Sequence, residues 1–228
     1  APFVMHQRWH DLLFMHWRVP AAELRARIPR ELEIDTFGGA AWLAVVPFRM
    51  SGIRPRYLPS VRGLSAFPEL NVRTYVTAGG RPGVWFFSLD AANPVAVSIA
   101  RNWFKLPYFE ARMRCQATAD QGIDYASTRT HVGAPPAEWS GRYRPTGPAF
   151  DAQPGTLEYF LTARYCLYTS DARERVYRGE IDHVAWPLQP AEAEVRANGM
   201  AGAHGLALPD AAPHLLFVRD IDVRVWPL

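Results

Sequence analysis

Acidic, amide and basic side chains alternate in one short part of the sequence, residues 67–73 (FPELNVR). On a β-strand every second residue points to the same side, so Glu69, Asn71 and Arg73 would share one face. If that face is turned into a barrel, the three groups converge in an arrangement suited to acid–base chemistry on a small ligand. The alternative is a solvated strand face, which is the more common outcome of such alternation.

A single lysine stands among aromatic residues where a predicted helix gives way to a strand. Lys105 is the only lysine among 25 basic residues, and residues 100–109 around it read ARNWFKLPYF. Junctions between elements often display binding groups. A lysine shielded from water can act as an amine nucleophile. A lysine at a helix end more commonly stays in solvent, where the helix dipole stabilises its charge. Both alternatives stay open at this point.

Three histidines near the N-terminus, His6, His10 and His16, invite comparison with a metal site. On one strand, at ~3.3 Å per residue, His6 and His10 lie about 13 Å apart, too far for a shared ion. A helix would bring them one turn apart, but the glutamate and third ligand of an HExxH site are missing. The sequence also has no GxGxxG or GKS/GKT phosphate loop. We therefore predict no metal and no cofactor.

Signals of nucleophilic catalysis, membrane insertion and nucleic-acid binding are missing as well. No GxSxG motif occurs, and neither Cys115 nor Cys166 belongs to a CxxC motif. Both cysteines lie in apolar segments, which is typical of buried thiols in a reducing compartment. No apolar run approaches the ~20 residues of a membrane span. The arginines are interspersed with acids at a net charge of +3, so no basic patch for nucleic acid is evident. We expect a cytoplasmic protein whose partner is a small molecule.

Turn signals predict one mainly antiparallel β domain over residues 1–228, with a few helices. Paired glycines at 38–39 and 79–80 suit tight hairpins. Strands are predicted at 10–18, 32–35, 40–50, 71–78, 84–90, 111–119, 123–131, 164–169, 174–184, 191–197 and 214–226. Residues 132–156, rich in proline and glycine, are predicted to form a long surface excursion.

Three helices are predicted within this β pattern, at residues 20–28, 93–104 and 156–162. Asn93 is placed to cap the second helix, followed by Pro94 at the first helical position. Val95, Ile99 and Trp103 recur every four residues, which predicts that this helix buries one stripe against the sheet.

Several segments, in order along the whole chain, resemble a known family. They are HQRWHDLLFMHWRVP, LEIDTFGGAAWLAVVPF, FPELNVRTYV, FFSLD, ARNWFKLPYFEA, FLTARYCLY and DVRVWPL. On these segments the chain is identified as a member of the YqjF-like family of uncharacterised conserved proteins. That family in turn resembles acetoacetate decarboxylase. The resemblance implies a cone-shaped, mostly antiparallel β-barrel around an apolar pocket, and by analogy a homo-oligomer.

The resemblance also suggests site residues, position by position. Glu69 corresponds to a glutamate that helps form the decarboxylase site within a short YxE segment. Arg8 corresponds to an arginine near the first strand that lines the same site, if a two-residue insertion is allowed. Arg101 follows the LD...P...GR pattern at the start of the decarboxylase's helix.

The decarboxylase's two lysines are missing from the corresponding positions of this chain. After its glycine-arginine pair the decarboxylase has PKK, where one lysine forms a Schiff base and the other assists it. Aligned on Pro107, these two positions are Tyr108 and Phe109, and Lys105 lies three residues before Tyr108. A phenol cannot form an imine. The resemblance therefore implies no acetoacetate decarboxylation, and Tyr108 becomes a candidate proton donor.

Together these observations predict an enclosed small-molecule pocket. The first hypothesis is an enzyme acting on a small carbonyl or carboxylate compound without Schiff-base chemistry, similar to a lyase or hydratase. Glu69 and Tyr108 are its candidate catalytic residues. The candidate substrate-binding residues are Arg8, Arg73, Arg101 and Lys105. The alternative is a non-catalytic protein that binds an apolar small molecule among its aromatic side chains.

Overall fold

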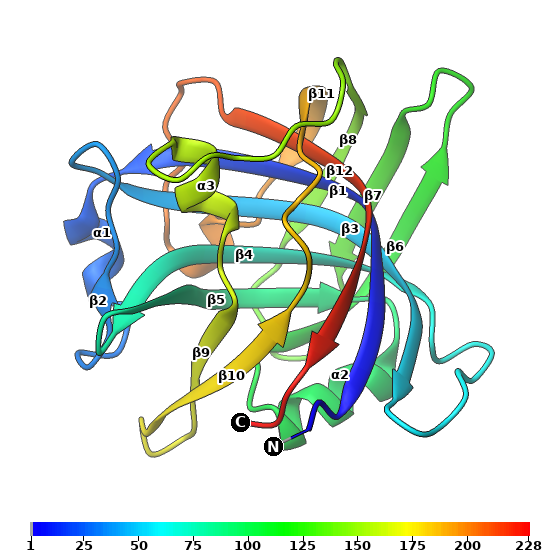
Figure 1. The fold of residues 1–228 in the computed structure, drawn as a ribbon, viewed down its shortest axis with the longest axis horizontal. Helices are drawn as coiled ribbons and strands as arrows, with labels where there is room; N and C mark the ends of the chain where they lie inside the picture. The colour runs from blue at the N-terminus through cyan, green and yellow to red at the C-terminus, as the bar shows by residue number, and fades with distance from the viewer. Residues whose placement is uncertain (1) are drawn as a thin grey trace.

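The computed structural model describes residues 2–228, which form one sheet of 12 strands with three short α-helices (Figure 1). The strands are β1 (Met5–Val19), β2 (Glu33–Ile34), β3 (Ala41–Pro55), β4 (Phe67–Ala78), β5 (Arg81–Ala91), β6 (Tyr108–Ala117), β7 (Ile123–Arg129), β8 (Glu138–Pro145), β9 (Cys166–Ser170), β10 (Val176–Asp182), β11 (Gln189–Asn198) and β12 (His214–Val225). The helices are α1 (Ala21–Arg25), α2 (Pro94–Trp103) and α3 (Leu157–Thr162), with a 3-10 turn at Gly202–His204. None of these helices combines the length and apolar character that crossing a bilayer requires.

The sheet closes on itself in two places and so forms two rings that share a wall. A closed nine-strand barrel runs in the order β5-β6-β7-β8-β11-β12-β1-β3-β4. A second, smaller ring forms because β9 pairs with β5 at Val84 and Trp85, while β10 pairs with β12 at Val225 and Arg224. Strands β12, β1, β3, β4 and β5 belong to both rings.

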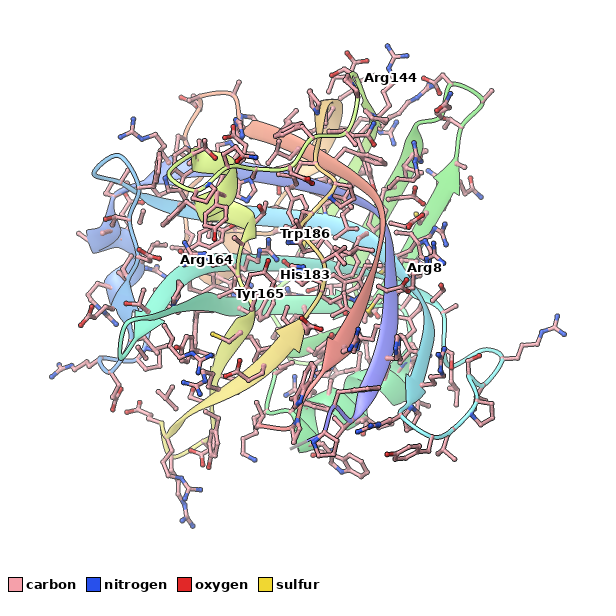
Figure 2. The ribbon with its side chains drawn as sticks, in the orientation of Figure 1. Arg8, Arg144, Arg164, Tyr165, His183 and Trp186 are labelled. Atoms are coloured by element: carbon pink, nitrogen blue, oxygen red, sulfur yellow. The ribbon has the colours of Figure 1, made fainter. Side chains whose placement is uncertain are left out.

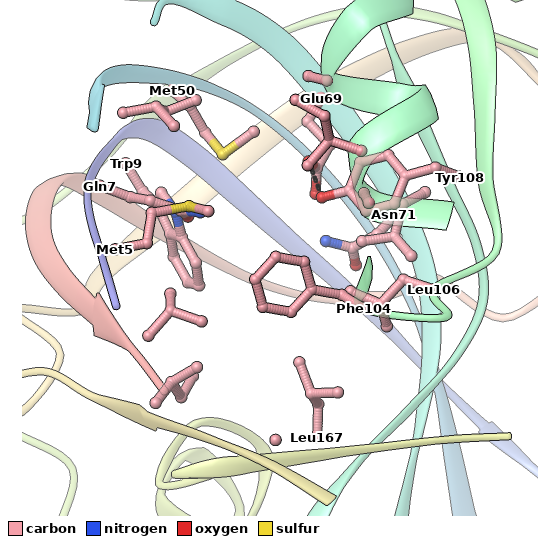
Figure 3. A pocket seen from close by; sticks show the side chains of 18 of the residues that line it. Met5, Gln7, Trp9, Met50, Glu69, Asn71, Phe104, Leu106, Tyr108 and Leu167 are labelled. Carbon is pink, nitrogen blue, oxygen red and sulfur yellow. Dashed lines mark hydrogen bonds between the residues drawn. The ribbon is translucent and has the colours of Figure 1, made fainter. Parts of the chain in front are cut away.

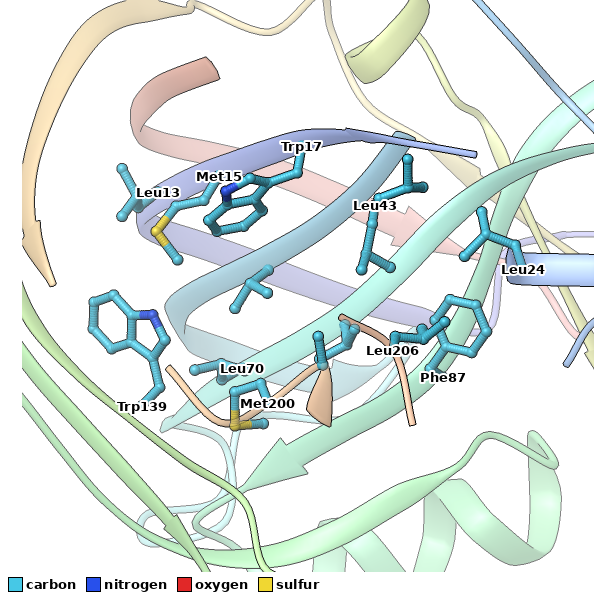
Figure 4. Close-up of a cluster of buried hydrophobic side chains, with 14 of the residues drawn as sticks. Leu13, Met15, Trp17, Leu24, Leu43, Leu70, Phe87, Trp139, Met200 and Leu206 are labelled. Carbon is cyan, nitrogen blue, oxygen red and sulfur yellow. The ribbon is translucent and has the colours of Figure 1, made fainter. Parts of the chain in front are cut away.

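Alternate residues of the shared wall face two different interiors. On β1, Leu13, Met15 and Trp17 belong to the large apolar cluster inside the nine-strand barrel (Figure 4). Leu12 and Phe14 belong to a second cluster on the opposite side of the wall. Because both faces are covered, residues 12–15 of β1 (LLFM) form a continuous apolar run instead of an apolar–polar alternation.

The predicted β pattern and the three helices are confirmed. The glycines at 38–39 form a tight turn closed by a bridge between Phe37 and Ala40, but β2 pairs with β4 and not with β3. The β4–β5 hairpin turns at Gly79 and Gly80, whose positive φ angles of 56° and 73° favour glycine. Asn93 caps α2, since its side-chain oxygen accepts hydrogen bonds from the backbone N–H groups of Val95 and Ala96, both at 3.1 Å. These features depend on local sequence alone.

The predicted surface excursion over residues 132–156 is wrong in part, because it contains β8. Trp139 and Tyr143 on this strand are fully buried inside the barrel. Gly141 lies between them on the same face, where an added Cβ would approach the Glu194 backbone oxygen to 2.8 Å. Close packing therefore requires glycine, which reads in the sequence as a turn residue and hides the strand's alternation.

The apolar stripe of α2 does not pack against the sheet as predicted. Val95, Ile99 and Trp103 are 49%, 43% and 76% exposed, whereas Val97, off the stripe, is buried. The four-residue spacing places the three side chains on one side of the helix, but spacing cannot tell what covers that side. In the folded chain the stripe lines a cavity.

Candidate functional site

A cavity of about 720 Å³ lies inside the smaller ring, between the shared wall and the strands β9 and β10. Most of its lining is apolar, as Figure 3 shows for Met5, Trp9, Met50, Phe104 and Leu167. Binding sites for small molecules commonly measure roughly 300–1,000 Å³. The cavity is therefore large enough for a ligand of many more atoms than a three-carbon acid.

Strand β4 carries its two charged residues and its asparagine on the cavity side. Glu69, Asn71 and Arg73 all line the cavity and are 2%, 4% and 8% exposed. The intervening Leu70 and Val72 point the other way, into the apolar cluster of the nine-strand barrel. The predicted alternation is confirmed, but the polar face looks into the space enclosed by the smaller ring and not into the barrel's own core.

Glu69 and Tyr108 meet at the wall of this cavity (Figure 3). The Tyr108 hydroxyl donates a hydrogen bond of 2.6 Å to Oε2 of Glu69. Burial away from water raises the pKa of Glu69 from 4.5 to about 8, with a further increase from the charge of Asp90, while hydrogen bonds from Tyr108 and Asn71 oppose the shift. Burial also raises the pKa of Tyr108 well above its usual value of 10, and the Glu69 charge adds to this. Tyr108 thus remains a donor, while Glu69 can exchange a proton near neutral pH.

The backbones on both sides of this pair are anchored. The buried Tyr125 hydroxyl, inside the nine-strand barrel, donates to the backbone oxygen of Glu69 at 2.7 Å. On the other side, Tyr108 begins β6, which pairs with β5 at Leu89, and Arg101 donates to the backbone oxygen of Tyr108 at 2.6 Å. A side-chain pair with both supports fixed can hold one geometry without loop movement.

Asn71 and Arg73 have unused hydrogen-bonding capacity. The amide of Asn71 hydrogen-bonds to Glu69, and its Oδ1 is buried without a partner. Nε of Arg73 is likewise buried without a partner. The guanidinium of Arg73 lies 5.2 Å from the ring centroid of Phe14 and 6.0 Å from that of Tyr75. Buried polar groups are rarely left unsatisfied, so these atoms are suited to contact a ligand.

Three of the predicted substrate-binding residues lie outside the cavity. Arg8 is on the surface, where it pairs with Asp220 at 3.0 Å with its side chain 48% exposed. Gln7 and Trp9 on either side of it line the cavity, so the strand's alternation turns Arg8 away. Arg101 holds the backbone of Tyr108, as described above, and its side chain points to a separate surface hollow.

Lys105 lies in the same surface hollow as Arg101 and not in the cavity. Its ammonium group is 5.0 Å from the ring centroid of Tyr177. The backbone of Lys105 has a positive φ of 50°, which turns the chain between α2 and β6. After this turn Leu106 and Tyr108 line the cavity, and the lysine does not.

Sequence reasoning missed a second group of cavity residues, which come from the last residue of α3 and the chain that follows it. Thr162, Arg164 and Trp186 line the cavity, and Figure 2 shows Arg164, His183 and Trp186 gathered inside the fold while Arg144 points outward. Arg164 pairs with Asp35 at 2.6 Å. No motif marks these residues, because they reach the cavity only through the pairing of β9 and β10 with the wall.

The three histidines of β1 have separate surroundings. His10 is 2.7 Å from the Ser51 hydroxyl, and His16 is 2.7 Å from the Tyr75 hydroxyl. Within residues 2–228, no group of three or more histidine, cysteine or acidic side chains is placed to hold a metal ion. Cys166 is buried and Cys115 half-buried, both as free thiols.

Comparison with known proteins gives one sequence family and one fold. Residues 6–222 match the profile of the family DUF2071, described as "Uncharacterized conserved protein". "Uncharacterized protein YqjF" of Bacillus subtilis (strain 168) is 46% identical over 226 residues, which cover 99% of this chain and 92% of that protein.

Solved structures resemble this chain at much lower identity. The enduracididine biosynthesis enzyme MppR complexed with pyruvate superposes with a TM-score of 0.65 at 13% identity, over 99% of this chain and 89% of the other. Acetoacetate decarboxylase from Legionella pneumophila gives 0.62 at 11% identity, over 100% and 88%. At these identities the matches show a shared fold, and the predicted acetoacetate decarboxylase-like architecture is confirmed.

Proposed function

The chain belongs to the DUF2071 family of uncharacterized conserved proteins, and we propose that it is an enzyme acting on a small carbonyl or carboxylate compound. The observation that carries the proposal is the 2.6 Å hydrogen bond between Tyr108 and a buried Glu69 inside a ligand-sized cavity. Two proteins of the same fold are named as a pyruvate complex and as an acetoacetate decarboxylase. Both names involve small carbonyl acids, which supports the proposed substrate class.

The proposed chemistry is removal of a proton from the carbon next to a carbonyl. The Glu69 carboxylate takes the proton, and the electron pair of the broken C–H bond moves into the carbonyl to give an enolate. Tyr108 then turns its hydroxyl from Glu69 to the enolate oxygen and stabilises the charge by a hydrogen bond. The orphaned Oδ1 of Asn71 accepts a hydrogen bond from a hydroxyl group of the substrate.

This chemistry does not use a Schiff base. The sole lysine, Lys105, lies outside the cavity, and Tyr108 lines the wall where the family resemblance places the amine. We expect borohydride reduction in the presence of pyruvate or acetoacetate to leave the protein's mass unchanged. A covalent adduct on Lys105 would contradict this part of the proposal.

The test of the proposed function is hydrogen–deuterium exchange at the carbon next to the carbonyl, followed by NMR over a panel of oxo acids that runs from 2-oxo and 3-oxo acids to longer acids with the carbonyl at the end remote from the carboxylate. For any acid that the wild type exchanges, we expect Glu69→Gln to lower the rate by about 10²- to 10⁴-fold. Glu180→Gln is the matched control, since Glu180 also lines the cavity but pairs with Arg178 and Arg81. Equal exchange by the Glu69 and Glu180 variants would exclude Glu69 as the base.

A non-catalytic binding protein is the second candidate function, favoured by the mainly apolar lining of the cavity. This function requires a ligand that remains bound and unchanged. Native mass spectrometry of the purified protein would reveal such a ligand, and absence of exchange with every acid of the panel would favour binding over catalysis.

A further inference from the structure

We propose that Arg73 anchors the carboxylate of an elongated, mainly apolar acid, whose other end reaches the Glu69–Tyr108 pair. This inference deepens the proposed function. It rests on that function only for the statement that the end of the ligand at Glu69 and Tyr108 is the end that reacts. The anchoring itself is a binding property, and it can be measured without turnover.

Arg73 is the exception among the buried arginines of the described chain. Arg129 and Arg164, equally buried, pair with carboxylates at 2.7 and 2.6 Å. Arg73 forms no ion pair with any of residues 2–228; it contacts the rings of Phe14 and Tyr75 and hydrogen-bonds to the Tyr75 hydroxyl. A buried cation without a counter-charge is costly, and a ligand anion would offset that cost.

A single carboxylate fits this site better than a phosphate. The guanidinium is planar and binds a carboxylate through two parallel hydrogen bonds. A phosphate carries more charge and needs further cations, but the neighbouring Arg164 is already paired with Asp35. The remaining charged residues of the lining are Arg54, which is only partly buried, and the acids Glu69 and Glu180.

The spacing of Glu69 and Arg73 along β4 favours an elongated ligand. Glu69 and Arg73 are four residues apart on one face, which places their Cα atoms about 13 Å apart at ~3.3 Å per residue. A three-carbon acid therefore has difficulty contacting both ends, whereas a longer acid can. The surfaces between and beyond these residues are apolar, among them Phe48, Phe86 and Leu89, so the body of the ligand should be apolar too.

Binding of octanoate and its methyl ester tests the anchor, with the fluorescence of Trp9 and Trp186 in the cavity wall as the readout. We expect wild-type protein to bind octanoate at least tenfold more tightly than methyl octanoate, since hydrogen bonds to charged groups are the stronger ones. In Arg73→Met the two ligands should bind equally. Arg54→Met, which removes a cavity-lining charge of lower burial, should keep the wild-type preference.

Several outcomes would overturn the inference. They are equal binding of acid and ester by wild type, retention of the preference in Arg73→Met, and binding of acetate or sulfate as tight as that of octanoate. Near-UV circular dichroism verifies that the Arg73 variant is folded, and Arg73→Lys, which keeps the charge, should retain part of the preference. If the preference fails while Glu69-dependent proton exchange persists, the anchor is wrong and the proposed function stands. If the acid preference holds but no Glu69-dependent proton exchange is found, the anchor stands and the proposed function is wrong.

Discussion

Glu69 is 2% exposed, and its carboxyl group accepts a hydrogen bond from the neutral Tyr108 hydroxyl. Burial raises its pKa from 4.5 to about 8. Between pH 4.5 and pH 8 the folded protein keeps a proton on Glu69 that the unfolded chain has released. The free energy of unfolding is therefore highest below pH 4.5 and falls as the pH rises towards 8. At pH 7 this difference amounts to about 3 kcal/mol of lost stability.

We therefore expect Glu69→Gln to be more stable than wild type at pH 7, by up to about 3 kcal/mol, and equally stable near pH 4. Glutamine can still accept the Tyr108 hydrogen bond but has no proton to lose. Urea denaturation at pH 4, 6 and 8 measures the effect, and Glu180→Gln should show the wild-type decline. A Glu69→Gln variant that loses stability between pH 5 and 8 as wild type does would contradict the assignment.

The same carboxyl group predicts the pH dependence of proton exchange. Only ionised Glu69 accepts a proton, so we expect kcat/KM to rise with pH and to level off above about 8. The Tyr108 hydrogen bond lowers the pKa of Glu69. Tyr108→Phe should therefore move the inflection of the profile to higher pH, in addition to slowing the reaction. An inflection that stays in place would show that Tyr108 does not act through Glu69.

Among the elements, the contact of β5 with β9 closes the smaller ring and depends on Gly83. A Cβ at this position would lie 2.7 Å from Cys166 Sγ, 2.7 Å from a Tyr168 ring carbon and 2.9 Å from the Cys166 backbone oxygen. We expect Gly83→Ala to destabilise the protein by about 1–3 kcal/mol through overpacking. Gly202→Ala is the control, since nothing lies within 4 Å of its added Cβ. Thermal denaturation that does not distinguish the two variants would contradict this account.

Helix α2 presents its apolar stripe to the cavity mouth, so its residues should matter for binding more than for stability. Ile99 is 43% exposed and lines the cavity. We expect Ile99→Asn to weaken octanoate binding several-fold while changing the free energy of unfolding by less than about 0.5 kcal/mol. Val132→Asn, at a residue 95% exposed and away from the cavity lining, should change neither property. A large loss of stability in Ile99→Asn would instead restore the predicted packing of the stripe on the sheet.

For the whole molecule, a buried ion pair ties the shared wall to the rest of the nine-strand barrel. Asp90 on β5 accepts two hydrogen bonds from Arg129 on β7, at 2.7 and 2.9 Å, with both side chains at most 1% exposed. Removing one partner leaves the other charge buried, so Arg129→Met should cost about 3–5 kcal/mol. Arg8→Met, which breaks a surface pair, should cost less than about 1 kcal/mol. Chemical denaturation compares the two, and similar losses would contradict the prediction.

The sequence by itself determined the features that depend on near neighbours. The Asn93 cap, the glycine hairpin at residues 79–80 and the alternation of Glu69, Asn71 and Arg73 follow from local backbone geometry and strand period. The family resemblance added the general architecture and the prediction that Tyr108 and Phe109 stand at the positions of the lysine pair.

Only the tertiary structure decided which face of a strand lines the cavity and which face packs in a hydrophobic core. Periodicity groups side chains, but the pairing of β5 with β9, more than 80 residues apart in sequence, decides that one face of β4 lines a cavity while the other packs in a core. The same pairing brings Arg164 to the cavity, and alternation on β1 turns Arg8 out of it. Such placements depend on contacts between distant segments, which no local pattern of residues encodes.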